Sequence, residues 1–361
     1  MPLASQFVST WPRPRSRHTR ATTASSSTGA AGLAIRDKTN FIGAKVPSGR
    51  NRVTNKQKRA VLIAGPTASG KSGAAVAIAQ RLGGIVINAD AMQVYDDLKV
   101  VSARPSPQEQ AGIPHYLFGH VDAGERYSVG RWLEDVAPVL SAAARRGQYA
   151  VIVGGTGLYF KTLLEGLSTI PDIPSQITSH WNRQLKEHGS WALHSILMAQ
   201  DAETADELDS NDSQRIVRAL CVRQATGKSI RQFSNSQPLL ADSDITIQAA
   251  LLPDRKQLYA RIEERFDNMI EAGALPEVEA LIVRGLPDDL PAMRAIGVPE
   301  LAGFLSGEQT LDEAIEKAKT NSRRYAKRQM TWIRGQMADW TLFTEPEDLV
   351  SQCLDLCGDQ A

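Results

Sequence analysis

The sequence predicts an α/β fold with a core of parallel strands, a helical insertion and a helical C-terminal region. Short apolar runs at residues 59–64, 84–89 and 149–153 have the length and composition of buried parallel strands. The first run leads into a glycine-rich loop, and a good helix-forming segment follows that loop. The middle of the chain and its last third have long helical patterns, and a strand-like run at 245–252 returns the chain to the core.

Composition restricts the classes of function. The 361 residues are 42% hydrophobic and 22% charged, which is ordinary for a soluble globular protein. No apolar run approaches the roughly 20 residues that span a bilayer, so we expect no membrane association. A net charge of +1 means that any nucleic-acid site must be a local basic patch. Three cysteines (Cys221, Cys353 and Cys357) favour free thiols in a reducing, cytoplasmic compartment over a disulfide framework or a zinc site.

The N-terminal segment differs from the rest of the chain. Its first 59 residues contain twelve lysines and arginines and one acid, Asp37, and they are rich in serine and threonine. Residues 1–58 are interpreted as a disordered basic extension or the product of a start codon placed too far upstream. An organellar transit peptide, which would imply import in a eukaryote, is the alternative. We expect the folded protein to begin near Arg59.

The first predicted strand enters a phosphate-binding motif. The motif fits G-x-x-x-x-G-K-[ST] between a strand and a helix, and it reads Gly65-Pro66-Thr67-Ala68-Ser69-Gly70-Lys71-Ser72. Its backbone N–H groups and the helix N-terminus can bind a diphosphate, Lys71 adds a positive charge, and Ser72 can hold Mg²⁺. The core is therefore predicted to be P-loop NTPase-like, with all eight residues binding diphosphate. The motif alone does not specify ATP.

Two further strand ends carry candidate catalytic groups. Asp90 follows the second predicted strand and would face the same crevice as the P-loop, as a Mg²⁺ ligand, a general base or a helix cap. The third strand ends in Gly154-Gly155-Thr156, where an ATP-hydrolysing P-loop protein would have an acid. The paired glycines would let the backbone approach a ligand closely. Thr156 could bind diphosphate, position a nucleotide or cap a helix.

These blocks together resemble a known family. Gly65–Ser72, Asp90–Tyr95 and Gly154–Tyr159 are similar to the signature blocks of the tRNA dimethylallyltransferases, also called tRNA isopentenyltransferases. The resemblance extends from about Val61 to Trp340 in the family's order. Further blocks that agree are Ser102–Pro105, Pro114-His115, Tyr127-Ser128, Asn211-Asp212, Gln214-Arg215 with Arg218, and Arg323–Arg334.

The resemblance implies a reaction. A dimethylallyl group would pass from dimethylallyl diphosphate to the exocyclic amine of the adenosine 3′-adjacent to the anticodon, in tRNAs reading codons that begin with U, giving isopentenyladenosine and diphosphate. It implies that Asp90 is the general base, that Thr156 gates the channel, and that Mg²⁺ bridges Ser72 and the diphosphate. The implied partners are the tRNA anticodon stem-loop and the prenyl donor, bound by a monomer. The implied tRNA-binding or substrate-binding residues are Asp90, Ala91, Met92, Gln93, Thr156, Thr178, Gln214, Arg215, Ile216, Val217 and Arg218.

The sequence departs from the family pattern at four places. Ala91 replaces a serine that usually follows the catalytic Asp, and Val101 replaces the glycine of a Gly-Thr-Ala-Lys-Pro block. Gly119 stands where an acid is expected, and Thr178 where an arginine commonly contacts tRNA. Loss of one phosphate contact weakens RNA binding without changing the reaction.

The predicted organisation divides the chain into a P-loop core at 59–170 and 244–345, a helical insertion domain for tRNA at 171–243, and a tail at 346–361. Buried anchors expected in the insertion are Trp181, Leu185, Trp191, Leu193, Ile196 and Leu197. Residues 317–334 contain seven lysines and arginines and no acid, which favours RNA contact. Tyr325 and Trp332 share a helix face there and either stack on bases or pack in the core.

Two rival functions remain open. A P-loop small-molecule or nucleoside kinase would need ATP and an acid after the third strand, which the glycine pair disfavours. A non-catalytic RNA-binding protein would tolerate the loss of Lys71, Asp90 or Thr156, but all three are present.

Overall fold

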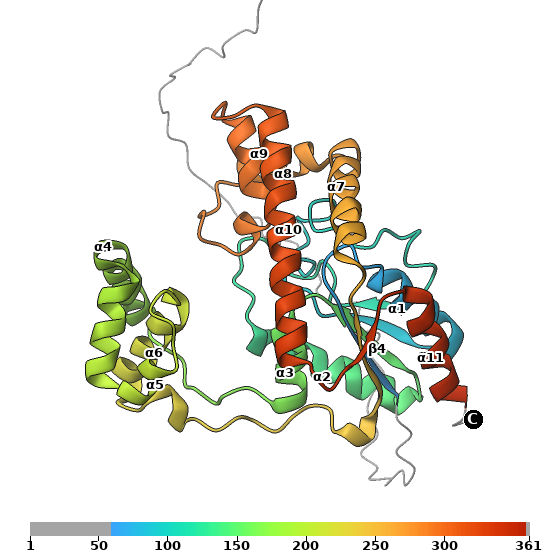
Figure 1. Cartoon of the computed structure of the whole chain (residues 1–361), viewed down its shortest axis with the longest axis horizontal. Helices are drawn as coiled ribbons and strands as arrows, with labels where there is room; N and C mark the ends of the chain where they lie inside the picture. The colour runs from blue at the N-terminus through green and yellow to red at the C-terminus, as the bar shows by residue number, and fades with distance from the viewer. Residues whose placement is uncertain (1–58, 359–361) are drawn as a thin grey trace, which may run out of the picture. The chain divides into compact units, whose positions relative to one another are not determined.

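The computed structural model describes residues 59–358, so the predicted basic extension at 1–58 lies outside the described part. A six-stranded sheet in the order β3-β2-β4-β1-β5-β6 forms the core, and every neighbouring pair of strands is parallel (Figure 1). The strands are β1 Ala60–Ala64, β2 Ile85–Asn88, β3 His115–Tyr116, β4 Ala150–Gly154, β5 Ile245–Leu251 and β6 Thr341–Phe343. The predicted parallel α/β core is therefore confirmed.

Helices cover both faces of the sheet, which explains why its central strands are apolar along their whole length. On one face, Val61 and Ile63 of β1 pack with α1 (Lys71–Leu82) and α11 (Pro346–Gly358). On the other face, Leu62 belongs to the cluster that contains α2 (Val129–Arg146) and α3 (Gly157–Glu165). Successive side chains of β1 thus point to opposite faces, as a strand requires.

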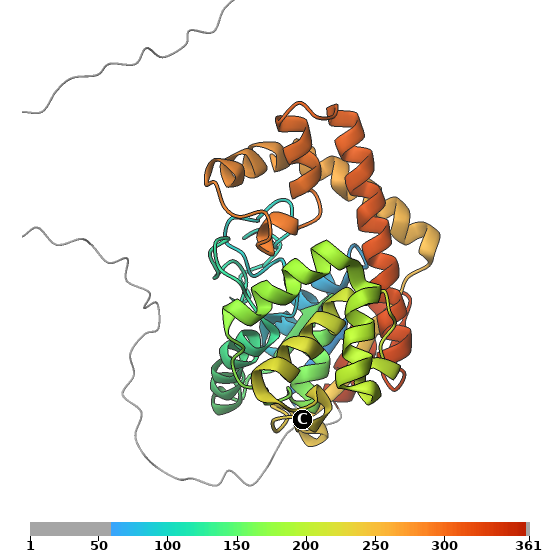
Figure 2. The same ribbon diagram turned by 90° about the vertical axis from the view of Figure 1, so that its left-hand side faces the viewer.

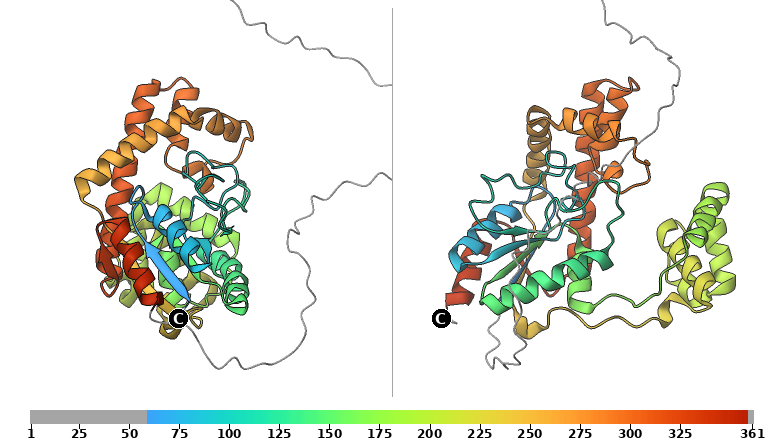
Figure 3. Two further views of the ribbon diagram at one scale, coloured as in Figure 1. Left: turned by 90° about the vertical axis from the view of Figure 1, so that its right-hand side faces the viewer. Right: turned by 180° about the vertical axis from the view of Figure 1, so that it is seen from behind.

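The C-terminal segment that the sequence separates as a tail forms part of this core. Leu349, Cys353 and Cys357 of α11 are buried against the sheet, and α11 lies beside α1 (Figure 3). All three cysteines of the chain are free and buried. Cys353 and Cys357 are one helical turn apart on the buried face of α11, so they act as small apolar residues there.

The predicted insertion is a bundle with its own core. It comprises α4 (Ser175–Gln200), α5 (Ala202–Asp206), α6 (Ser213–Thr226) and a 3₁₀ turn, η1 (Ile230–Gln232), which pack on one another (Figure 2). Trp181, Leu193 and Leu197 are buried as expected. The expectation for Trp191 is wrong, because its side chain is 70% exposed. Gly189, with φ of 78°, kinks α4 just before Trp191.

A group of C-terminal helices carries residues to the carboxyl edge of the sheet. The group contains α7 (Arg255–Glu271), α8 (Ala274–Val283), η3 (Ala292–Arg294), α9 (Val298–Leu305) and α10 (Leu311–Gln336), whereas the 3₁₀ turn η2 (Asp242–Asp244) precedes β5. Helix α10 packs on α7 and α9 and continues to α3, where Lys161 donates to Gln336 over 3.0 Å (Figure 1). Among the described helices, none combines the length and apolar character of a membrane span.

Candidate active site

The P-loop joins β1 to α1 and is shaped to hold an anion. Gly70 has φ of 92°, a left-handed conformation that lets the chain turn into α1 at Lys71. Ala68 is also left-handed, with φ of 62°, which is uncommon for a residue with a side chain and marks a constrained loop. The Lys71 ammonium donates to the Pro66 carbonyl over 3.1 Å. Burial lowers the pKa of Lys71 to about 8, and the nearby Asp90 carboxylate partly opposes that shift.

Asp90 is held firmly at the end of β2. The buried side chain of Asn88 accepts from the Asp90 N–H over 2.8 Å and donates to the Asp90 carbonyl over 2.9 Å. One carboxylate oxygen of Asp90, Oδ1, accepts from the Met92 N–H over 2.9 Å, and the other, Oδ2, faces Gly155. No helix follows Asp90 before residue 129, so the helix-cap interpretation is wrong. The carboxylate is available for acid–base or ion-binding chemistry.

Thr156 faces Asp90 across the sheet edge. Thr156 occupies the N-cap position of α3, but its hydroxyl accepts from the Ala91 N–H over 3.0 Å instead of bonding to the first turn of the helix. Gly154, the first glycine of the pair, is required by close packing, since a Cβ on this residue would lie 2.0 Å from the Ala89 carbonyl oxygen. The glycine pair was expected to make room for a ligand. In the structure, the ends of β2 and β4 and a side chain of α10 fill that space.

The α10 side chain is Gln329, and it connects the two glycine-rich loops. Its Oε1 atom accepts from the Thr67 N–H of the P-loop over 2.9 Å, and its Nε2 atom donates to the Gly155 carbonyl over 2.9 Å. The side chain is 5% exposed. Gln329 therefore fixes the spacing between the P-loop and the Gly155–Thr156 loop.

Arg265 is a site residue that sequence reasoning missed. Its guanidinium donates to the Thr67 hydroxyl, and it lies close enough to Asp90 and Lys71 to act on their charges. Burial lowers the pKa of Arg265, and Asp90 opposes that shift. A signal was present: Arg265 falls at helical spacing with Leu258, Ile262 and Met269, so it is a cation on the apolar face of α7. Such a cation is placed to bind an anion in the interior.

Thr67, Asp90 and Arg265 are among the residues that line a cavity of about 270 Å³. One part of the cavity wall is apolar. Another part carries the Asp90 carboxylate and the guanidinium groups of Arg265, Arg294 and Arg328. Arg328 lies over the Tyr325 ring with its guanidinium carbon 5.5 Å from the ring centre, so Tyr325 lines the site, whereas Trp332 packs against the core. The lining residues are Thr67, Asp90, Ala91, Met92, Val101, Ser102, Ile262, Arg265, Phe266, Met269, Arg294, Ala295, Ile296, Ser322, Tyr325 and Arg328.

The remaining predicted substrate residues lie on the insertion helices. Gln214, Arg215 and Arg218 are exposed on α6. Ile216 and Val217 are buried in the bundle core at 0% and 7% exposure, so their side chains pack within the bundle, and their contact with substrate stays a prediction.

Two other predicted residues also have a structural partner. Thr178 on α4 lies against the Cys221 thiol of α6, so it links the two helices of the bundle. The Gln93 amide donates to the Ser102 and Ala103 carbonyls over 3.1 and 3.0 Å, which ties the Asp90 loop to the Ser102 block.

The departure at Gly119 has a structural explanation. The Arg104 guanidinium occupies the place where a side chain at residue 119 would lie, 1.4 Å from an added Cβ. It donates to the Tyr95 and Asp96 carbonyls over 3.3 and 3.4 Å and pairs with the Asp96 carboxylate. A side chain at residue 119 would require the Arg104 side chain to shift, and Gly119 has φ of 53°, a conformation that favours glycine.

Comparisons with known proteins agree with this site. A profile of the IPP transferase family matches residues 93–336, and a profile described as isopentenyl transferase matches residues 58–118. A tRNA dimethylallyltransferase of Rhizobium etli is 51% identical over 289 residues, which cover 80% of this chain and 97% of that protein. One of Hyphomonas neptunium is 48% identical, with 80% and 92% covered.

Solved structures give the same answer. The full-length tRNA isopentenylpyrophosphate transferase of Bacillus halodurans has a TM-score of 0.60 and 32% identity, over 84% of this chain and 96% of that one. A eukaryotic dimethylallyltransferase acting on tRNA has a TM-score of 0.64 and 30% identity, over 77% and 70%. The chain therefore belongs to the IPP transferase family, the family of the tRNA dimethylallyltransferases.

Proposed function

We propose that this protein transfers a dimethylallyl group from dimethylallyl diphosphate to the exocyclic amine of an adenosine in tRNA, releasing diphosphate. The observation that carries the proposal is that Thr67 of the P-loop, Arg265 and the Asp90 carboxylate line one cavity, with the Lys71 ammonium near enough for Asp90 and Arg265 to act on its charge. Two half-buried cations fit a diphosphate leaving group, and a carboxylate beside them fits a base.

The chemistry follows from these positions. The amine nitrogen attacks the allylic carbon that bears the diphosphate, the carbon–oxygen bond breaks, and the amine loses a proton to Asp90. Lys71 and Arg265 stabilise the charge that develops on the departing diphosphate. The Met92 N–H and Asn88 amide hold Asp90 in place, so the carboxylate is oriented before the adenine arrives.

The acceptor part of the proposal concerns RNA. An adenine inside an RNA loop must leave its stack to reach a cavity, as for base-modifying enzymes in general. The apolar side chains of Ile262, Phe266 and Met269 provide a face for the base and the prenyl group, and Arg328 adds a cation at the rim. We assign the target to the adenosine 3′-adjacent to the anticodon in tRNAs reading codons that begin with U, as the family resemblance implies.

Mg²⁺ is proposed as the metal. Among residues 59–358, no cluster of three or more His, Cys, Asp or Glu side chains could hold a metal by itself. Mg²⁺ usually binds through substrate phosphates with one or two protein groups, and the exposed Ser72 hydroxyl at the start of α1 fits that arrangement. When bound, Mg²⁺ would neutralise charge on the diphosphate.

The proposal also covers the oligomeric state of the protein and its cellular compartment. The acting unit is proposed to be a monomer, as the family resemblance implies. Three free cysteines support a reducing compartment, and we assign the cytoplasm.

The test is transfer of label from radiolabelled dimethylallyl diphosphate to unmodified tRNA with Mg²⁺. Wild type should label the adenosine beside the anticodon, and Asp90→Ala should be slower by orders of magnitude. Asp339→Ala, which removes an exposed acid elsewhere, is the matched control and should behave as wild type. Phosphorylation of a small acceptor by ATP, without prenyl transfer, would favour the kinase alternative. Protection from thermal unfolding by dimethylallyl diphosphate rather than ATP is a second readout.

A further inference from the structure

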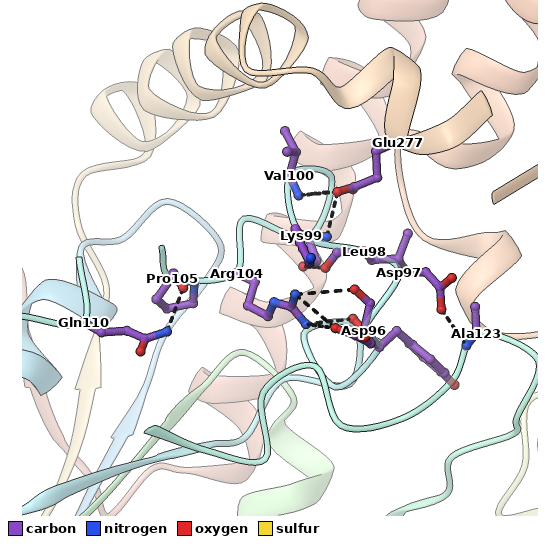
Figure 4. Close-up of polar contacts among 12 residues, drawn as sticks. Asp96, Asp97, Leu98, Lys99, Val100, Arg104, Pro105, Gln110, Ala123 and Glu277 are labelled. Atoms are coloured by element: carbon purple, nitrogen blue, oxygen red, sulfur yellow. Dashed lines mark hydrogen bonds and ion pairs between the residues drawn. The ribbon is translucent and has the colours of Figure 1, made fainter. Parts of the chain in front are cut away.

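A carboxylate outside the reaction centre holds one wall of the cavity. Glu277 lies in the first turn of α8 and accepts hydrogen bonds from three consecutive backbone N–H groups. Its Oε2 atom accepts from Lys99 over 2.9 Å and from Val100 over 2.8 Å, and its Oε1 atom accepts from Val100 over 3.1 Å and from Val101 over 2.9 Å. Figure 4 shows Glu277 pointing from α8 at this backbone. Consecutive N–H groups turned to one side form a nest for an anion.

The segment that Glu277 binds has no regular structure to hold it. Residues 98–104 belong to neither a helix nor a strand. The N–H groups of Ala103 and Arg104 bond to carbonyls within the turn, whereas those of residues 99–101 bond to Glu277. Ala103 has φ of 50°, a conformation that a residue with a side chain keeps only where its surroundings impose it. The Ser102 hydroxyl donates to the Leu98 carbonyl over 2.6 Å, which closes the turn around the nest. The loop geometry therefore depends on the acceptor that α8 provides.

The same segment forms part of the cavity. Val101, whose N–H is bound by Glu277, and the next residue, Ser102, line the cavity with Asp90, Ala91 and Met92. The Gln93 amide, donating to the Ser102 and Ala103 carbonyls, ties this wall to the Asp90 loop. The hydrogen bonds of this wall run to Gln93 and to Glu277, whereas the Lys71 ammonium donates to Pro66 within the P-loop. We therefore expect a shift of Val101 and Ser102 to alter the space beside Asp90 more than the P-loop.

We propose that Glu277 is a positioning residue for the acceptor: it holds the Val101–Ser102 wall at the place where the adenine of tRNA docks beside Asp90. This inference rests on the proposed function, and it assigns Glu277 no contact with either substrate. It also connects the C-terminal helices to the Asp90 loop, because α8 contributes the acceptor and the β2–β3 connection contributes the donors. Arg284, just after α8, makes a second tether through ion pairs to Asp97 and Asp122 over 2.5 and 2.7 Å.

The first variant is Glu277→Gln, which keeps the size of the side chain but replaces one acceptor oxygen by a donor. We expect hydrogen exchange at the amides of residues 99–101 to become at least about tenfold faster, since hydrogen bonds to a charged acceptor are lost. The KM for tRNA should rise on the order of tenfold, and the KM for dimethylallyl diphosphate should stay within about twofold. Glu277→Asp, a carboxylate one methylene shorter, should recover part of the tRNA effect.

Two control variants separate positioning from general loosening. Glu279→Gln, an exposed acid on the same helix, should match wild type in exchange and kinetics. Arg284→Gln breaks the other tether and should lower the melting temperature without changing the KM for tRNA. If Arg284→Gln raises that KM as much as Glu277→Gln, or if Glu277→Gln raises both KM values equally, the positioning role is wrong. If Glu277→Gln and Glu279→Gln give the same hydrogen exchange and the same KM values while wild type prenylates tRNA, the positioning role is wrong but the proposed function stands. Failure of wild type to transfer the group overturns the proposed function as well.

Discussion

Raising the pH should weaken binding of the prenyl donor through one side chain, Lys71. The pKa of this lysine is lowered from its ordinary 10.5 to about 8, mainly by burial, with Asp90 partly opposing the shift and Arg265 adding to it. A bound diphosphate stabilises the charged ammonium, so binding and protonation are coupled. With a pKa of about 8, the ammonium fraction is about nine-tenths at pH 7 and about one-tenth at pH 9. The affinity for dimethylallyl diphosphate should therefore fall about tenfold between these two values.

The assay is calorimetric titration of dimethylallyl diphosphate without tRNA, at constant Mg²⁺, from pH 7 to pH 9.5. Lys71→Arg is the control, because a guanidinium stays charged throughout this range, and its affinity should be nearly independent of pH. A flat profile for wild type would refute the reasoning. So would a fall in the Lys71→Arg variant that runs parallel to the wild-type fall.

The lowered pKa of Lys71 should make the ligand-free protein more stable as the pH rises, in contrast to its effect on donor binding. Because the folded-state pKa is below the unfolded value, the unfolded chain binds more protons between about pH 8 and pH 10.5. The contribution of Lys71 to the free energy of unfolding therefore rises with pH in that window, and it is lowest below pH 8. Diphosphate should remove this dependence, which urea unfolding with and without the ligand can measure.

Three substitutions test other parts of the site. Arg265→Lys removes the planar guanidinium beside Thr67. Steady-state kinetics should show a KM for the prenyl donor that is raised about tenfold and an unchanged KM for tRNA. Equal changes in both KM values would contradict a role of Arg265 in diphosphate binding. Gln329→Leu leaves the Thr67 N–H and the Gly155 carbonyl without partners, so urea unfolding should show a loss of about 2–5 kcal/mol, and a loss below about 1 kcal/mol would mean that water replaces the amide. Leu197→Ala opens a cavity in the core of the insertion and should cost about 2–5 kcal/mol. Hydrogen exchange should then accelerate in α4 and α6 but not in the sheet, and acceleration in both would show that the bundle does not fold as a separate unit.

The strands and the P-loop could be predicted because their signals are local. Apolar runs such as 60–64 bury both faces of a strand, and the Gly65–Ser72 spacing dictates a loop that enters a helix N-terminus. Asp90 and Thr156 could also be singled out, since each directly follows a predicted strand. The competing cap roles could be removed only when the structure showed that neither side chain caps a helix.

Burial within helices was harder to predict. Trp191 is a large aromatic residue and yet is exposed, because it lies two positions, about 200° of helix rotation, before the buried Leu193 and so points away from the bundle. Ile216 and Val217 lie inside a block that resembles substrate-binding residues, but helical periodicity turns them inward while Arg215 and Arg218 turn outward. Similarity to a family motif covers the whole 214–218 block, whereas the solvent exposure of each side chain depends on its own position on the helix.

The sequence by itself determined the parallel α/β core, the phosphate loop and the carboxylate beside it, because the apolar pattern of a strand and the hydrogen bonds of a turn or a helix depend on neighbouring residues. The tertiary structure alone decided which distant groups complete the site. Gln329 contacts Thr67 across 262 positions, Arg265 contacts it across 198, and Glu277 binds Val100 across 177. Such contacts depend on how helices pack against the sheet edge, and that packing arises from the summed burial of many side chains rather than from a local pattern.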